Sequence, residues 1–422
     1  MIIIKRILIV EQGRFSMKKY ILNRLRELGY TLTLLTQFEF VFDNDLYDKV
    51  ISCKFNEWDK VIEILKKEHK TNKFIGVFGY DEISIPIVDE ISKSLNLKII
   101  SKFSGESYRF KDKMRIAWES SGVSIPKYKI LHKKEDYKYL NEFSFPMVLK
   151  PVSYLGSLGV IKVNSYSELK DKVNLAFNAE LSFEVGKNSY NLKDLYSLES
   201  SVLAEDYIEG DEYSAEGYLI DGRYELIGFT KKFTTKDDFF DELAHIFPYK
   251  FKQEEEIVEE IRKAHVSLGI QNAFTHTEFK IINNKVCFME LGARLSGDFI
   301  PKLIENSFEI DAIDYAIKCR TGESIENIKY VKNKIKNKYT AIYFISAPIE
   351  SYGKKFNGIA INDMLKDKII EIEEYYTVGD VIEAAKYSGK ERVGHIILED
   401  SDYKDIKAKL ILLYKNIKVE YY

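Results

Sequence analysis

The chain has 422 residues, with 63 Lys and Arg against 66 Asp and Glu and a formal net charge of −3. This length allows roughly two or three domains, each with a core of its own. The near balance of charge excludes a strongly basic surface, so neither nucleic acid nor a membrane is expected as a partner. The cysteines Cys53, Cys287 and Cys319 are odd in number and lie far apart. They predict a cytoplasmic, reducing compartment without disulfides or structural zinc.

The N-terminal MIIIKRILIV indicates a buried strand rather than a secretion signal, because Lys5 and Arg6 interrupt its apolar run. Strand-like and helix-like segments then alternate to about residue 100, which predicts a parallel sheet built from βαβ units. The turn EQGRFS after the first strand lacks a G-x-G-x-x-G pattern, so no dinucleotide site is expected there. The expected strands are 7–10, 31–35, 74–78 and 98–100, and the expected helices are 18–28, 61–68 and 83–95.

A turn of small residues follows the next expected helix and strand. The helix, 110–121, ends at Gly122, and the strand ends at Lys150 and Pro151. The turn SYLGSLGV then leads into a strand from Val160. Glycine imposes no side chain, so backbone amides in such a flap can approach a phosphate closely, and Lys150 would add a positive charge. The alternative is an ordinary hairpin turn.

Downstream, a short apolar strand, 201–205, ends in an acid. The segment EDYIEGDEYSAEGYLIDGRYELIGF then predicts an antiparallel meander with turns at 209–210 and 221–222. Beyond Lys232 the pattern loosens into TTKDDFFDELAHIFPYK, which predicts a loop whose acids, aromatics and histidine suit a binding site. Helices are expected at 254–268 and 301–320, and a small α+β module from about residue 333 onward, with a strand at 339–346 and a last helix ending at Lys415.

The pair Glu278 and Glu290, followed by Arg294, is the strongest chemical signal in the chain. Each glutamate lies on an alternating apolar run, and Asn283 and Asn284 mark a turn between the two runs, so a β-hairpin with one carboxylate on each strand is expected. Two carboxylates on rigid neighbouring strands suit Mg²⁺, and an arginine just beyond them can hold a phosphoryl group or an oxyanion. The alternative is a pair of surface acids.

Taken in this order and spacing, Lys150 with its Gly-Ser flap, the EDYIEGDE segment and the Glu278, Glu290 and Arg294 set resemble the ATP-grasp superfamily. The resemblance covers essentially the whole chain. It implies a multidomain α/β and α+β fold. The implied parts are an N-terminal pre-ATP-grasp domain at 1–100, an ATP-grasp domain at 101–330 with a lid subdomain at about 115–204, and a C-terminal α+β module at 331–422.

The resemblance also implies an ATP site. Its first phosphate lysine is Lys111, counted eleven residues before Gly122, with Lys113 as a rival. The other implied contacts are Lys150 at the phosphates, Gly156, Ser157 and Gly159 closing over them, Glu205 and the backbone from Asp206 to Ile208 at the adenine, and Glu212 at the ribose.

For the chemistry, the resemblance implies Mg²⁺ on Glu278 and Glu290, with Mn²⁺ as a substitute, and Arg294 at the reacting group. Gly292 departs from the family pattern, because an asparagine often stands there, and this leaves the number of ions open. ELGARLSGD and HTEFK are instead similar to the branch of carboxylate-amine ligases that join amino acids. In that branch an acid and a histidine three residues later face the substrate amine. Glu242 and His245 match them, with Asp237, Asp238 and Asp241 as rival acids and His276 as a second-layer or merely structural histidine.

The implied activity is therefore an ATP-dependent, ADP-forming carbon-nitrogen ligase. It would join a small-molecule carboxylate and an amine, two amino acids above all, through an acyl phosphate. A homodimer is the expected assembly. The alternatives are another ATP-grasp ligase, of the purine or carboxylase type, and an ATP-binding regulatory protein without turnover.

Overall fold

The computed structural model describes residues 4–11, 17–38, 44–154, 156, 158–179, 182–185, 188–191, 200–235, 240–325, 338–361, 369–384 and 391–422. Ser157, Asp237 and Asp238, which the sequence marked as candidate site residues, lie outside these ranges. Within the ranges the chain forms one eight-stranded sheet, two four-stranded sheets and two two-stranded sheets.

The N-terminal segment forms the predicted parallel sheet. Ile7 to Val10 of its first strand are fully buried, as expected when helices cover both faces of a sheet. The strand predicted at 98–100 is wrong, because the side chain of Asp89 accepts the amides of Ile100 and Ser101 at 2.6 and 3.3 Å in place of a strand partner. In sheet order the strands are β3 (Lys49–Ser52), β2 (Tyr30–Thr36), β1 (Lys5–Val10) and β4 (Phe74–Phe78), and the longer helices are α1 (Lys18–Glu27), α2 (Trp58–Thr71) and α3 (Ser84–Ser94).

A second four-stranded sheet, antiparallel throughout, contains the predicted flap. Gly156 and Gly159 in its turn have φ angles of 60° and 70°, which favour glycine. In sheet order the strands are β5 (Tyr128–Leu131), β10 (Val202–Asp206), β6 (Met147–Pro151) and β7 (Ile161–Val163). The helices α4 (Glu106–Arg109) and α5 (Lys111–Ser120) precede these strands in the chain, and α6 (Tyr166–Phe177) packs on the sheet. The strands β8 (Ser182–Val185) and β9 (Asn188–Asn191) form a separate hairpin.

The eight-stranded sheet is the centre of the molecule, and its neighbouring strands are all antiparallel. The hairpin turn predicted at 221–222 is confirmed. A hairpin at 209–210 is wrong, because the strand before it belongs to the four-stranded sheet and the strand after it to the eight-stranded one. In sheet order the strands are β15 (Lys285–Gly292), β14 (Ala273–Ile282), β11 (Glu212–Ile220), β12 (Arg223–Thr234), β13 (Glu242–Tyr249), β16 (Tyr339–Ser346), β19 (Arg392–Asp400) and β18 (Ile369–Glu374).

Two further predictions about this region are corrected by the structure. Much of the loop predicted after Lys232 is the strand β13, which pairs with β12 on one side and β16 on the other. The single helix predicted at 301–320 is two helices, α9 (Ile300–Phe308) and α10 (Ala312–Thr321). Glu309 ends the first at a φ of 55°, and the carboxylate of Asp311 caps the second by accepting the amides of residues 313 and 314. The helix predicted at 254–268 is confirmed as α8 (Glu254–Ser267).

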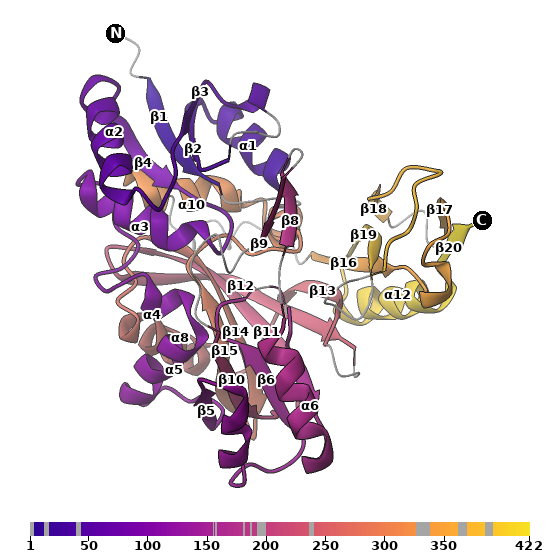
Figure 1. The fold of residues 1–422 in the computed structure, drawn as a ribbon. Helices are drawn as coiled ribbons and strands as arrows, with labels where there is room; N and C mark the ends of the chain where they lie inside the picture. Colours follow the sequence, from indigo (N-terminus) through magenta and orange to yellow (C-terminus); the bar gives the residue numbers. More distant parts are fainter. Residues whose placement is uncertain are drawn as a thin grey trace.

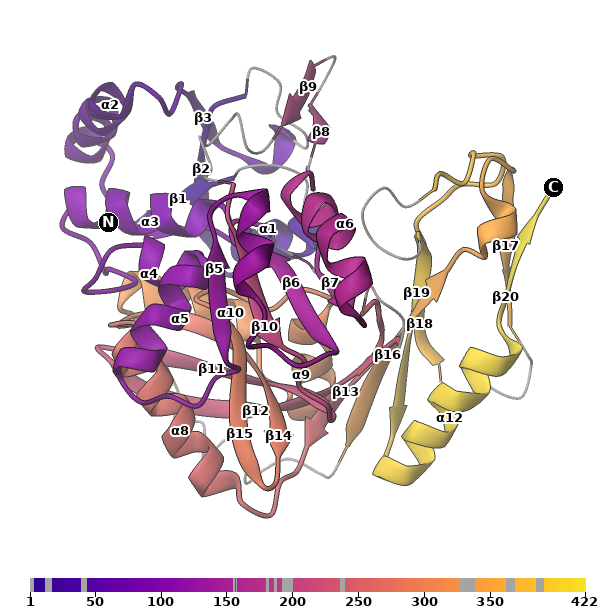
Figure 2. The same cartoon turned by 60° about the horizontal axis from the view of Figure 1, so that its bottom comes forward.

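Three of the C-terminal strands, β16, β19 and β18, continue the central sheet. β16 lies against β13, so the domain boundary placed at residue 331 divides one continuous sheet, and the three-domain division stays a prediction. Figures 1 and 2 show these strands to one side of the other elements, beside α12 (Tyr403–Asn416) and the small sheet of β17 (Phe356–Ala360) and β20 (Lys418–Tyr421). No helix among the described residues has the length and apolar character that crossing a membrane requires.

Candidate active site

A cleft of about 550 Å³ opens between the four-stranded sheet and the eight-stranded sheet. Its walls carry residues of β6 and β10 on one side and of β11 to β15 on the other. Gly159 does not line it, because the Cβ position of that glycine points at Ala179 and Pro151, 2.8 Å from each. The predicted site residues that do line the cleft are Lys111, Lys150, Gly156, Glu205, Asp206, Ile208, Glu212, Glu242, His245, Glu278, Glu290 and Arg294.

The hairpin of β14 and β15 presents the two predicted carboxylates side by side. Glu278 and Glu290 are register partners across the strands. Their side chains are 24% and 29% exposed, so both can reach a ligand in the cleft. The hairpin prediction is confirmed, and the structure brings its two acids together.

Lys111 and Lys150 line the cleft from different elements, α5 and β6. Lys111 of α5 donates to Glu290 Oε1 at 2.9 Å and to the carbonyl of Tyr154 at 2.7 Å. Its rival Lys113 is exposed on the same helix and does not line the cleft. The buried site thus contains Lys111 and not Lys113.

Lys150 is held by Glu205 at the floor of the cleft. Lys150 Nζ and Arg115 Nε each lie 2.5 Å from a different oxygen of Glu205, which is 1% exposed. Burial alone would raise the pKa of Glu205, but Arg115 and then Lys150 lower it to about 2. The acid is therefore ionised and orients Lys150. Its predicted place beside an adenine stays a prediction, and Arg115 was not anticipated from the sequence.

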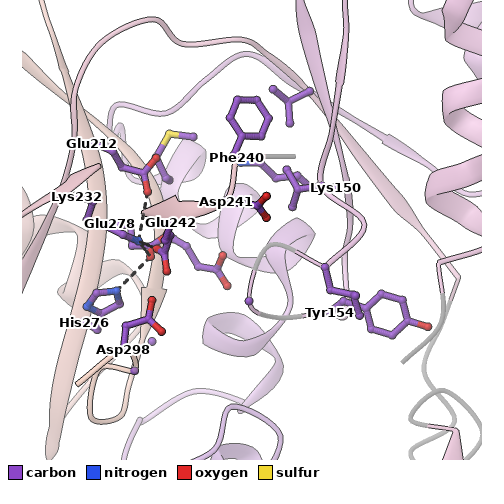
Figure 3. A pocket seen from close by; sticks show the side chains of 18 of the residues that line it. Lys150, Tyr154, Glu212, Lys232, Phe240, Asp241, Glu242, His276, Glu278 and Asp298 are labelled. Atoms are coloured by element: carbon purple, nitrogen blue, oxygen red, sulfur yellow. Dashed lines mark hydrogen bonds and ion pairs between the residues drawn. The ribbon is translucent and has the colours of Figure 1, made fainter. Parts of the chain in front are cut away.

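A buried lysine, Lys232 of β12, lies between three carboxylates and was missed by the sequence reasoning. Its Nζ is 2.5 Å from Glu242 Oε1, 2.5 Å from Glu278 Oε1 and 3.3 Å from Glu212 Oε1. Figure 3 shows these acids arriving from separate strands, with Lys150 across the cleft. Burial would lower the pKa of Lys232, but Glu242 and the other two carboxylates hold it well above its usual value. The lysine is therefore a fixed positive charge.

His276 joins Glu278 to a second, fully buried acid. Its Nδ1 lies 2.9 Å from Glu216 Oε1 and its Nε2 lies 3.1 Å from Glu278 Oε1. Burial would lower the pKa of His276, but Glu216 and then Glu278 raise it to about 10. A protonated imidazole that donates from both nitrogens thus holds Glu278 in place, which agrees with the second-layer alternative for this histidine.

The predicted pair Glu242 and His245 meets two residues that no sequence signal had marked. His245 Nε2 lies 3.2 Å from Asp298 Oδ2 and 3.8 Å from Glu242 Oε2. Arg392 of β19 donates to Asp298 Oδ1 at 2.8 Å. Burial raises the pKa of Glu242. The positive charge of Lys232 opposes this rise, and the negative charge of Asp298 adds to it. This end of the cleft is therefore a dense network of acids and cations.

Arg294 forms an ion pair with Glu82 of the N-terminal segment, and its Nη1 donates to the carbonyl of Leu295 at 2.7 Å. Gly292 lies beside this pair. A Cβ at Gly292 would sit 3.5 Å from Glu82 Oε2 and 3.6 Å from Arg294 Cγ, so a longer side chain there would have to share their space. The position where the family often has an asparagine is thus a glycine here, and it lies beside the ion pair of Arg294 and Glu82.

Residues 143–302 match the family model described as the ATP-grasp domain. This part of the chain is therefore an ATP-grasp domain, and the sheets described above form the ATP-grasp fold that the sequence predicted.

Two curated proteins and one solved structure are similar to this chain. Alanine–anticapsin ligase of Bacillus subtilis (strain 168) is 31% identical over 262 residues, which cover 57% of this chain and 53% of that protein. D-alanine–D-alanine ligase of Flavobacterium psychrophilum is 30% identical over 182 residues, covering 40% and 49%. The crystal structure of the L-amino acid ligase from Bacillus licheniformis superposes with a TM-score of 0.78 at 20% identity over 99% of both chains, which shows a shared fold. The chain spans about half the length of the curated relatives it matches.

Proposed function

We propose that this protein is an ATP- and Mg²⁺-dependent carboxylate-amine ligase that joins amino acids through an acyl phosphate and releases ADP and phosphate. The observation that carries the proposal is one cleft that unites the lysines Lys111 and Lys150, two neighbouring carboxylates and a separate network of acids and cations. The named relatives, which are ligases of amino acids, support it.

ATP would lie along the side of the cleft between the two larger sheets. Lys111 and Lys150 would contact its phosphates, and Gly156, with Ser157 and Gly159, would form the turn that closes over them. At the other end of the nucleotide, Glu205 and the backbone from Asp206 to Ile208 would face the adenine, and Glu212 the ribose. Glu212 suits that place because it lines the cleft and is partly exposed. Its contact with Lys232, at 3.3 Å, is also longer than those of Glu242 and Glu278 with the same lysine.

The donor set fits a Mg²⁺ ion. Glu278 and Glu290 supply hard oxygen ligands from neighbouring strands, and each uses only its Oε1 in the protein contacts described above. Bound there, the ion would neutralise charge on the transferred phosphoryl group. Lys232 and His276 would keep Glu278 ionised and fixed in position for this task.

The protein's own part in phosphoryl transfer is positioning and charge neutralisation. A substrate carboxylate attacks the γ-phosphorus of ATP and becomes an acyl phosphate, because an oxide is too poor a leaving group for direct amide formation. The amine then attacks this carbonyl, and Arg294 would donate to the developing oxyanion before phosphate leaves. Glu242 and His245 would hold the amine.

The test is phosphate release from ATP and Mg²⁺ by the 422-residue chain, across a matrix of amino acids singly and in pairs, with product masses recorded. Release that needs a pair and yields the condensed mass is the expected result. Release with a carboxylate or bicarbonate but no second amino acid would indicate another ATP-grasp chemistry. ATP binding without release under every condition would overturn the ligase and favour a regulatory protein.

A further inference from the structure

A cluster of metal-ligating side chains lies outside the cleft, where β18 pairs with β19. Glu371 and Glu373 alternate onto the same face of β18, and His395 of β19 is the register partner of Glu373. Carboxylate oxygens of the two acids and a ring nitrogen of the histidine all lie within 4.8 Å of one another. None of the three residues lines the cleft. The cluster is therefore separate from the proposed ligase site.

His395 is fully buried, and one of its nitrogens has no hydrogen-bond partner in the described part of the chain. That atom is Nε2, which faces Glu371 Oε1 at 3.4 Å. An N–H···O hydrogen bond is ordinarily about 2.7–3.2 Å long. Ligand atoms bonded at about 2.0–2.1 Å to a tetrahedral Zn²⁺ are, by simple geometry, about 3.4 Å apart. The spacing of Nε2 and Oε1 is that of an ion pair and equally that of two ligands of one such ion.

The neighbours of the cluster orient both atoms toward that position. Tyr375 Oη lies 2.9 Å from the other ring nitrogen, Nδ1, and in the tautomer that donates this hydrogen bond from Nδ1 the lone pair of Nε2 is directed at Glu371. Lys302 pairs with the second oxygen, Oε2, of Glu371 and leaves Oε1 toward the imidazole. The ring of Phe299 stacks on His395 with centroids 4.4 Å apart and fixes the plane of the ring.

Glu373 supplies the third ligand from the solvent side. Its Oε2 lies 3.8 Å from His395 Nδ1, and its side chain is 51% exposed. To bind an ion at Nε2 the side chain must turn from Nδ1 toward Nε2, and its exposure leaves room for that rotation. An entering ion would therefore reach the buried nitrogen past Glu373.

We propose that Glu371, Glu373 and His395 bind a divalent transition metal such as Zn²⁺, with water as the fourth ligand. One imidazole and two carboxylates suit Zn²⁺, whereas Mg²⁺ prefers oxygen ligands alone. Phe299, which packs on His395, directly follows Asp298 of the cleft. The ion would therefore stiffen the wall that holds Asp298. This proposal does not depend on the proposed ligase activity.

The test is Zn²⁺ binding by the metal-free 422-residue chain, measured by equilibrium dialysis with metal analysis and by the melting temperature with and without Zn²⁺. Glu373→Gln is the principal variant, because its half-exposed side chain can change without disturbing the core, and His395→Gln is the second. Glu350→Gln, at an exposed acid of the short 3-10 turn Ile349–Ser351 after β16, is the matched control. His245→Gln removes the histidine of the other candidate ion cluster, Glu242, His245 and Asp298.

We expect Glu373→Gln and His395→Gln to lose one equivalent of Zn²⁺, or to bind it at least about tenfold more weakly, and to lose the associated rise in melting temperature. Glu350→Gln and His245→Gln should keep that equivalent. Zn²⁺ binding by Glu373→Gln equal to that of the unaltered protein would overturn the proposal. Loss of all binding in His245→Gln alone would place the ion in the cleft and would also overturn it.

Discussion

The β14–β15 hairpin and the β12–β13 hairpin direct charged side chains into the same cleft, but they are built differently. Asn283 and Asn284, with φ angles of 48° and 62°, form a two-residue turn that sets Glu278 opposite Glu290. The link between β12 and β13 is longer, and β13 has β16, which begins at Tyr339, as its other neighbour. The first hairpin is a local structure, whereas the second depends on a strand about ninety residues further along the chain.

The charged side chains of the two hairpins also differ in how far they are exposed. The acids of β14–β15 are partly exposed, which suits groups that meet a ligand. Lys232 of β12 is 3% exposed on its side chain and enclosed by acids of β11, β13 and β14. We infer that the acids of the first hairpin contact the reacting groups and that Lys232 of the second hairpin organises the acids around it. Four substitutions test this distinction.

Glu290→Gln on the first hairpin should have the largest effect. The neutral amide is a much weaker Mg²⁺ ligand, so turnover should fall by about 10³-fold or more, the rate equivalent of several kcal/mol. Phosphate release at saturating substrates measures this loss, and an unchanged melting temperature would show that the fold is intact. Activity within tenfold of the unaltered protein would remove Glu290 from the metal site.

Arg294→Ala, just beyond the same hairpin, should lower turnover by about 10²- to 10³-fold and leave ATP affinity nearly unchanged. Turnover assays and nucleotide titration calorimetry separate the two effects. The variant also frees the buried Glu82, so the double variant with Glu82→Gln is the control. Recovery of activity in the double variant would show that the unpaired Glu82, rather than a lost oxyanion contact, caused the defect.

Lys232→Met should act on stability as well as on rate, because it leaves three carboxylates without their shared cation. We expect a loss of about 3–5 kcal/mol in the free energy of unfolding. Lys231→Met is the matched control: Lys231 is also buried, but its partner Asp211 is 72% exposed, so the loss should be about 1 kcal/mol or less. Urea denaturation compares the two variants, and equal losses would contradict the organising role of Lys232.

His276→Gln should have the smallest effect, seen mainly in the pH dependence of stability. The pKa of His276 rises from 6.5 to about 10 on folding, so the charged imidazole stabilises the fold fully below pH 6.5 and loses this contribution as the pH rises toward 10. The free energy of unfolding should therefore fall less between pH 7 and pH 10 in the variant than in the unaltered protein. Parallel pH profiles for the two proteins would show that His276 is not charged in the fold.

Sequence patterns predicted the elements whose stabilising contacts are local. The Asp221–Gly222 turn and the hairpin at Asn283 are confirmed, and so is the N-terminal βαβ run as far as β4, apart from β3, which was not predicted. The long helix at 301–320 was wrong because its apolar periodicity continued across residues 309–311, while the cap at Asp311 is a side-chain contact that this periodicity does not reveal. β13 was missed because its acids and aromatics are typical of a loop in the sequence. In the fold it is a strand because β12 and β16 pair with its two edges.

The sequence alone determined the residues that lie at fixed spacings, which include Glu278, Glu290, Arg294, Lys150 and the small-residue flap. Only the tertiary structure decided what surrounds them. Lys232, Asp298, Arg392 and Glu82 come from different strands and loops, so their proximity depends on sheet order and on the packing of the N-terminal segment. Which of Lys111 and Lys113 lines the cleft was decided in the same way, because burial is a property of the folded chain, and the role of Lys111 at the phosphates stays a prediction. The physical reason is that spacing along the chain sets which side chains can share one strand or one turn, whereas the electrostatic environment of a site depends on residues that are brought together only by folding.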